Sequence, residues 1–213
     1  MRAVIPGVAD VWSQADPYAD AWHAGNIATL QTAGRRWIVL GDSMSQGIGA
    51  SAYDAGWVGQ LARRLAASGH NLQVLNLSAN GACVSDVLDQ QLPALEQIGV
   101  RPGDVVTVMV GSNDLFGGRA RRAALSGAYA HLVARVPRGT IVATLPHPTK
   151  AAGRANVHVE AAAASGAIVM CDLRVTGPTS WRGLLAADYF HPNDAGYAGI
   201  ATAFEPTLLD VLA

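Results

Sequence analysis

Five short apolar runs divide the chain, and longer segments of mixed polarity lie between them. The runs cover residues 37–43, 72–78, 104–111, 139–145 and 167–173. Each run is a nearly continuous series rich in Val, Ile and Leu that does not alternate with polar residues. Such runs are typical of strands covered on both faces, as in a parallel sheet. We therefore predict five parallel strands.

The segments between the runs have the spacing of helices. They cover residues 57–68, 84–95, 119–135, 156–165 and a last stretch from after Asn193 to near Ala213. Pro93 interrupts the second of these segments. The alternation of strands and helices predicts an α/β fold, a three-layer αβα sandwich with right-handed crossovers. We expect a flavodoxin-like strand order of 2-1-3-4-5.

Two parts of the chain lack this regular alternation. Residues 1–36 carry aromatic side chains such as Trp12 at loose spacing, and Asp16-Pro17 is the expected start of a helix there. We predict that these residues are an N-terminal extension packing on a single domain that spans residues 1–213. Whether the extension covers the sheet or contacts another copy stays open, as does the oligomeric state. Residues 174–189 are the least regular stretch.

Composition narrows the class of protein. The chain has 213 residues, of which 50% are hydrophobic and 15% charged, and its formal net charge is −1. This balance excludes a disordered chain and argues against a nucleic-acid-binding surface. No apolar stretch reaches the roughly 18 residues of a membrane span, and two cysteines are too few for a disulfide framework. Because no secretion signal is visible at the start, we expect a cytoplasmic protein.

Polar residues follow the predicted strands at the points where the strands end. Gly41-Asp42-Ser43 follows the first run, Gly81 comes shortly after the second, and Asn113-Asp114 follows the third. Asp188 and His191 lie just before the last helix. Ligands of such sheets bind at the carboxyl ends of the strands, so we expect these groups to converge on one edge.

Three of these residues have the chemistry of a nucleophilic site. A serine such as Ser43 needs a base to take its proton, and His191 is the best base in the chain. Pro192 favours a loop conformation for His191, and Asp188, three residues earlier, is close enough to hold the imidazole Nδ1–H. The donors for a developing oxyanion are the N–H groups of Ser43 and Gly81 and the side-chain amide of Asn113.

Each signal has a purely structural alternative. A serine at a strand end often caps a helix, and Asn113-Asp114 could serve only as a turn. Asp188 and His191 could cap the last helix, or bind a metal with Asp194, although no second histidine has ligand spacing. The joint occurrence of these groups, in this order, favours the catalytic interpretation.

That joint pattern resembles the SGNH hydrolases, also called GDSL-type esterases. The family's sequence blocks match residues 41–43 (Gly-Asp-Ser), 76–82, 111–114 and 188–193. Met44 stands where the family name has Leu. The resemblance covers roughly residues 37–213. It implies a flavodoxin-like sheet and ester hydrolysis without a cofactor or a metal, with the nucleophile Ser43, the triad partners Asp188 and His191, and the oxyanion-hole residues Gly81 and Asn113.

The sequence indicates the substrate less closely than it indicates the reaction. We find no long insertion that could form a lid, and this favours an open site and small or short-chain esters. Acetylated carbohydrates, lysophospholipids, thioesters and acyl transfer stay as alternatives within the family. The residues expected to line a substrate pocket are Met44, Val84, Leu115, Phe116, Trp181 and Leu184. His147, between two prolines, is expected on a surface loop rather than in this pocket.

Two other classes of protein are alternatives to an esterase. An inert binding module on the same fold would not react with an active-site phosphonate. A nucleotide- or flavin-binding protein of the same topology would carry its ligand through purification. The glycines of Gly47-Ile48-Gly49 resemble a dinucleotide fingerprint, but they begin well after the strand and no acidic residue follows at the required distance.

Overall fold

The sheet predicted from the apolar runs is present in the computed structural model, which describes residues 6–213. It has five strands in the order β2-β1-β3-β4-β5, and all neighbouring pairs are parallel. The strands are β1 (Arg36–Gly41), β2 (Gln73–Asn76), β3 (Val105–Met109), β4 (Ile141–Ala143) and β5 (Val169–Cys171). The predicted fold class and strand order are confirmed.

The strand register brings the polar segments to one edge. β1 lies in the middle of the sheet, with Val39 opposite Asn76 of β2 and Gly41 opposite Met109 of β3. Because all strands run in the same direction, their carboxyl ends share this edge. The segments that follow β1, β2 and β3 therefore start side by side.

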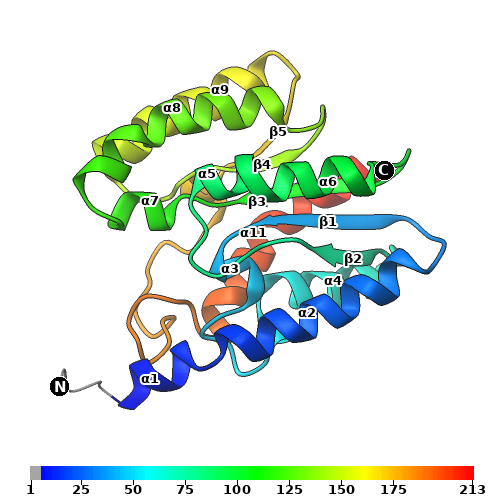
Figure 1. Ribbon diagram of the computed structural model, residues 1–213, viewed down its shortest axis with the longest axis horizontal. Coiled ribbons are helices and arrows are strands. Elements are labelled where there is room, and N and C mark those ends of the chain that lie inside the picture. Colours follow the sequence, from blue (N-terminus) through cyan, green and yellow to red (C-terminus); the bar gives the residue numbers. More distant parts are fainter. Residues whose placement is uncertain (1–5) are drawn as a thin grey trace.

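Helices cover both faces of the sheet (Figure 1). One face carries α5, α6, α8 and α9, and the other carries α4 and α11. The helices are α1 (Pro6–Trp12), α2 (Ala15–Leu30), α3 (Ser43–Gln46), η1 (Tyr53–Ala55), α4 (Trp57–Ala67), α5 (Val84–Asp86), η2 (Val87–Gln91), α6 (Leu92–Ile98), α7 (Ser112–Phe116), α8 (Arg119–Arg135), α9 (Lys150–Ala164), α10 (Leu173–Thr176) and α11 (Asp194–Leu212). Within residues 6–213, none of them combines the length and the apolar character needed to cross a membrane.

Alternate residues of β1 point into two separate cores. Ile38 and Leu40 pack under α5, α6, α8 and α9, whereas Trp37 and Val39 pack against α4 and α11. The second core contains an aromatic stack in which the rings of Trp57 and Phe204 lie 4.3 Å apart. Strands covered on both faces explain the continuous apolar runs.

Two helices differ from the sequence expectation. The segment expected as a helix interrupted at Pro93 is one unbroken helical run of α5, a π-helical turn (η2) and α6, and Pro93 lies in the first turn of α6, just after the π-helical turn. The Leu88 carbonyl, five residues before Pro93, accepts from Arg135 Nη1 at 3.3 Å. Helix α9 begins at Lys150 rather than at residue 156, because the Thr149 side chain accepts a hydrogen bond from the Ala152 N–H and caps it there.

The N-terminal segment lies against the outer edge of the sheet. Helix α2 packs on β2, where the side chain of Asn26 exchanges two hydrogen bonds with the backbone of Asn76, at 2.7 and 2.8 Å. The indole of Trp22 donates to the carbonyl of Gln46 at the end of α3. Helix α1, which precedes α2 in the chain, lies at the corner of the molecule near the carboxyl edge of the sheet (Figure 1).

Candidate active site

Ser43 opens the short helix α3 directly after β1. The side chain of Asp42 caps this helix by accepting a hydrogen bond from the Met44 N–H at 3.0 Å. Gly41 has φ +154, and a Cβ there would lie 2.3 Å from the Met109 carbonyl oxygen, so the close approach of β1 and β3 requires glycine. The tight turn places Ser43 at the end of β1, where the residue is only 3% exposed.

Ser43, His191 and Asp188 form a continuous hydrogen-bond chain. The Ser43 Oγ lies 2.9 Å from His191 Nε2, and His191 Nδ1 lies 2.6 Å from Asp188 Oδ2. Burial raises the pKa of Asp188, but the His191 ring and the N–H groups of Phe190 and His191 outweigh burial, so the pKa is lowered overall. Asp188 is therefore ionised at neutral pH and holds the proton on Nδ1, which leaves Nε2 to accept from Ser43.

A tight turn before α11 sets the positions of Asp188 and His191. The Tyr189 N–H donates to the Ala186 carbonyl, and Tyr189 has φ 55, the single positive value outside glycine among residues 6–213. The Ala186 N–H in turn donates to the His191 carbonyl at 2.8 Å. Asp188 Oδ1 accepts hydrogen bonds from the N–H groups of Phe190 and His191. The turn thus brings the carboxylate beneath the imidazole of a residue only three positions away.

Gly81 and Asn113 lie around the same cavity as Ser43, His191 and Asp188. This cavity has a volume of about 430 Å³, and we call it the triad cavity. Gly81 has φ +76, a conformation that favours glycine, and Asn113 lies in α7. One N–H of the Asn113 amide donates to the Ala82 carbonyl at 2.9 Å, so the second N–H remains for another acceptor.

Two buried carboxyl groups lie behind the nucleophile. Asp114 Oδ2 accepts a hydrogen bond from the Val84 N–H and so holds the start of α5. Burial raises the pKa of Asp42 to about 7, with the Met44 N–H lowering it and the charge of Asp114 raising it. Asp42 Oδ2 has no hydrogen-bond partner among residues 6–213. Both residues are buried, although Asp42 also borders the apolar cavity described next.

A second, apolar cavity of about 270 Å³ adjoins the triad cavity. Phe190 lines both cavities, and its ring lies 5.0 Å from that of His191 and 5.7 Å from that of Phe116. Three of the expected pocket residues line the apolar cavity, namely Met44, Phe116 and Trp181.

Other pocket expectations need correction. Val84 and Leu115 are buried in the core under α5 and α8 and line neither cavity. Leu185 lines the apolar cavity in place of Leu184, because the irregular loop turns the neighbouring residue inward. His147 lies on the loop after β4 as expected, but it is half-buried on the wall of the apolar cavity, and burial lowers its pKa.

The sequence interpretation missed the N-terminal contribution to the site. Val8, Val11 and Trp12 of α1 line the triad cavity opposite the residues that follow β1 and β2. Their aromatic and apolar character was visible, but no periodic signal placed them at this edge. No cluster of three or more His, Cys, Asp or Glu residues within 6–213 has the arrangement of a metal site.

Comparison with known proteins decides the family. Residues 39–198 match the model of the GDSL-like Lipase/Acylhydrolase family. The chain belongs to this family. The predicted membership of the GDSL-type ester hydrolases is thus confirmed, and the matched region includes Ser43, Gly81, Asn113, Asp188 and His191. A search of curated proteins found no match.

Solved structures share the fold of this GDSL-type hydrolase. The crystal structure of TesA is 24% identical, with a TM-score of 0.65, over 84% of this chain and 100% of that one. A family 3 carbohydrate esterase from Clostridium thermocellum is 20% identical, with a TM-score of 0.62, over 84% and 98%. The psychrotrophic esterase EstA from Pseudoalteromonas sp., inhibited by monoethylphosphonate, is 18% identical, with a TM-score of 0.62, over 84% and 99%. At these identities the likeness concerns the fold.

Proposed function

We propose that this GDSL-type hydrolase cleaves small or short-chain carboxylic esters through an acyl-enzyme intermediate on Ser43. The observation that carries the proposal is the hydrogen-bond chain from Ser43 Oγ to His191 Nε2 and from His191 Nδ1 to Asp188, at 2.9 and 2.6 Å. These distances are those at which a base removes a proton from a nucleophile.

The first half of the reaction forms the acyl-enzyme. Ser43 Oγ attacks the ester carbonyl carbon, and its proton passes to His191 Nε2. The carbonyl oxygen becomes an oxyanion that accepts hydrogen bonds from the N–H groups of Ser43 and Gly81 and from the free N–H of the Asn113 amide. The carbon–oxygen bond to the alcohol then breaks. The alcohol leaves with the proton from His191, while Asp188 stabilises the transient imidazolium.

The second half releases the acid. Water gives a proton to His191 Nε2 as its oxygen attacks the acyl carbon. The bond to Ser43 Oγ breaks, and Ser43 recovers its proton from His191. The same base, nucleophile and oxyanion donors serve both halves, so no cofactor enters the scheme.

The apolar cavity suits the acyl part of the substrate. Its walls are mainly apolar side chains, and it adjoins the triad cavity at Phe190. Its volume of about 270 Å³ lies below the range of pockets that enclose drug-sized ligands. We therefore expect acyl chains of a few carbons to be preferred over long chains.

Hydrolysis of p-nitrophenyl acetate, butyrate, hexanoate and octanoate tests the proposal. We expect Ser43→Ala to lower kcat/KM by at least about 10³-fold, because only binding and oxyanion stabilisation remain. Ser68→Ala, which changes an exposed serine at the end of α4, is the matched control and should leave the rate unchanged.

Two results would count against it. Native rates in Ser43→Ala would exclude Ser43 as the nucleophile. A preference for octanoate over acetate and butyrate would contradict the short-chain assignment while leaving the mechanism intact.

A further inference from the structure

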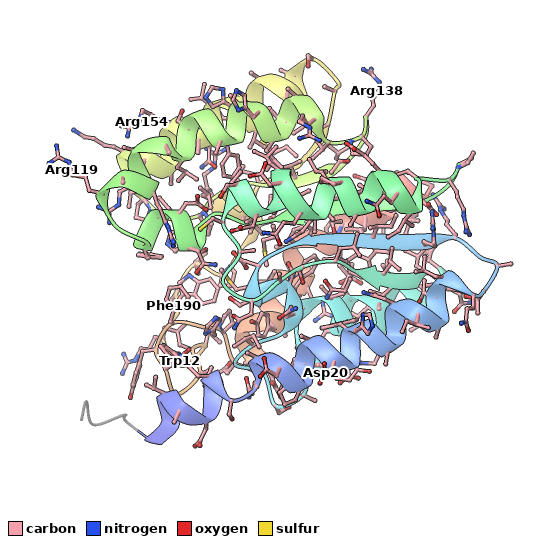
Figure 2. All side chains as sticks on the ribbon, in the orientation of Figure 1. Trp12, Asp20, Arg119, Arg138, Arg154 and Phe190 are labelled. Carbon is pink, nitrogen blue, oxygen red and sulfur yellow. The ribbon has the colours of Figure 1, made fainter. Side chains whose placement is uncertain are left out.

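Helix α1 lies outside the region that matches the family model, yet it forms one wall of the triad cavity. The match begins at residue 39, whereas Val8, Val11 and Trp12 line the cavity together with Ser43 and His191. Figure 1 shows α1 beside the loop that precedes α11, and Figure 2 shows Trp12 and Phe190 at the same corner of the molecule. The family match therefore does not account for this wall.

Specific contacts hold α1 at the site. Val11 is only 5% exposed, and Gly7 lies so close to Ala187 that a Cβ on Gly7 would come within 2.6 Å of the Ala187 Cβ. Ala187 belongs to the turn that carries Asp188, so α1 rests on the segment that positions the triad.

The start of α2 holds the same corner from the other side. The Gln14 side chain accepts from the Gly49 N–H at 2.8 Å and donates to the Ala50 carbonyl at 3.1 Å. The Tyr18 hydroxyl donates to the same carbonyl at 2.8 Å. Gly49 faces His191, because a Cβ at Gly49 would lie 2.8 Å from the His191 Cβ. The N-terminal segment is thus attached to the loops that follow the nucleophile and precede the base.

The position of the base indicates which half of the ester meets α1. The leaving oxygen must lie within reach of His191 Nε2, which supplies its proton. His191 lines the triad cavity with α1, whereas it does not line the apolar cavity on the other side of Phe190. With the acyl part in the apolar cavity, the alcohol part is left on the side of α1.

The wall that α1 provides is apolar and uncharged. Val8 and Trp12 face the cavity together with Ile48 and Phe190, and the Asp188–His191 pair holds the sole ionisable side chains among the described lining residues. Trp12 is 71% exposed although it lies on a cavity wall, so its indole is open to a ligand. An aromatic face without neighbouring charges binds neutral aromatic or bulky apolar groups.

We propose that Trp12 determines specificity for the leaving alcohol, favouring neutral aromatic or bulky apolar alcohols over small ones. This inference rests on the proposed function, because it assigns the alcohol side of the same Ser43 site. It concerns recognition only, since Trp12 takes no part in proton transfer.

Paired esters of one acid test this proposal. The ratio of kcat/KM in Trp12→Ala to that in the native protein is measured for 2-naphthyl acetate and for ethyl acetate, so that the intrinsic reactivity of each leaving group cancels. We expect about a 10-fold loss for the naphthyl ester, the size expected for an apolar contact, and less than a 2-fold change for the ethyl ester. Trp12→Phe should retain most of the naphthyl activity.

Two controls separate this test from the test of the proposed function. Leu30→Ala removes an exposed apolar side chain at the far end of α2 and should leave both ratios near one. Only activity that Ser43→Ala abolishes is counted, so an activity that survives in Ser43→Ala counts against the mechanism and not against Trp12.

A binding measurement gives a readout independent of turnover. Calorimetry compares 2-naphthol binding to Ser43→Ala and to the Ser43→Ala, Trp12→Ala double variant, and we expect about 5- to 10-fold weaker binding to the double variant. Equal binding, equal losses for both esters, or a larger loss with an acetylated sugar than with the naphthyl ester would each overturn the proposal.

Discussion

Asp42 and Ser43 are neighbours in the chain but have different roles at the site. Both residues are buried; Ser43 borders the triad cavity, whereas Asp42 borders the apolar cavity and its Oδ2 has no hydrogen-bond partner among the described residues. A buried carboxyl without a cationic partner is more stable as the neutral acid. This explains why burial raises the pKa of Asp42 to about 7, and it assigns Asp42 a structural role as the cap of α3.

The raised pKa of Asp42 predicts that stability falls as the pH rises. Asp42 binds its proton more tightly in the folded protein, with a pKa of about 7, than in the unfolded chain, where the pKa is about 4. The free energy of unfolding therefore falls as the pH rises between these two values. Asp42→Asn should remove this loss, which we expect to be on the order of a few kcal/mol. Urea unfolding of both proteins at pH 5 and pH 8 measures it.

Comparing the two proteins separates Asp42 from the other ionisable groups. Burial also raises the pKa of Asp114, so its contribution falls with rising pH in both proteins, and the difference between the proteins isolates Asp42. The carboxyl groups of Asp188 and Asp104 have lowered pKa values, so their contributions are lost only in more acidic solution. An equal loss of stability in the native protein and in Asp42→Asn between pH 5 and pH 8 would show that Asp42 is ionised throughout.

At the scale of elements, side-chain amides complete the ends of the strands. Each of three amides accepts from the N–H and donates to the C=O of one residue at or just beyond a strand end, as a neighbouring strand would. The pairs, with distances of 2.7–2.9 Å, are Asn26 with Asn76, Gln91 with Gly41, and Asn156 with Leu145. These hydrogen bonds hold the backbone at the carboxyl edge of the sheet, where pairing between strands ends.

The Gln91 pair has a direct consequence for the nucleophile. Gln91 is the last residue of η2, is buried, and holds Gly41, which precedes Asp42-Ser43. Gln91→Ala leaves a buried N–H and C=O without this partner, so we expect about 1–3 kcal/mol lower stability. We also expect about 10-fold lower kcat with little change in KM, because Ser43 loses its fixed position.

Gln90 offers a matched control for that experiment. It is exposed, and its amide donates a hydrogen bond to Asp86 Oδ1 at 3.3 Å. Gln90→Ala should leave both kcat and the unfolding midpoint nearly unchanged. If Gln91→Ala behaved like Gln90→Ala, the support of Gly41 by the π-helical turn would have no role in the site.

The elements were largely predictable from sequence, and the contacts between distant elements were not. The five apolar runs and their order sufficed for the sheet, and the i, i+3 spacing of Asp188 and His191 sufficed for their pairing. The turn of η2 is not visible in a sequence, because Gln91 is drawn inward by tertiary hydrogen bonds to Gly41. Likewise, Leu184 and Leu185 lie in a loop whose sequence has no regular spacing of apolar residues, so the sequence does not show that Leu185 is the one that lines the apolar cavity.

At the scale of the whole molecule, the site and the main buried ion pair lie at opposite ends of the sheet. Arg36 begins β1 and Asp104 precedes β3, and both side chains are almost fully buried where they pair. The Arg36 Nη2 also donates to the Gly99 carbonyl at 2.6 Å. The amino edge of the sheet is thus tied by a buried charge pair, and the carboxyl edge by neutral amides.

Breaking the buried pair should cost stability without changing specificity. Asp104→Ala leaves the Arg36 charge buried without its partner, and we expect a loss of about 3–5 kcal/mol in the free energy of unfolding. Asp54→Ala breaks the exposed pair with Arg63 and should cost less than about 1 kcal/mol. Thermal unfolding measures both, and equal effects of the two variants would contradict the account.

The central claim is that Ser43 becomes covalently acylated, and labelling with an active-site phosphonate tests it most directly. The native protein is treated with a p-nitrophenyl phosphonate, its intact mass is measured, and the modified peptide is located. We predict one phosphonyl group per chain, on Ser43, together with loss of esterase activity and no label on Ser43→Ala. A label on another residue, or an active enzyme that takes no label, would contradict the account.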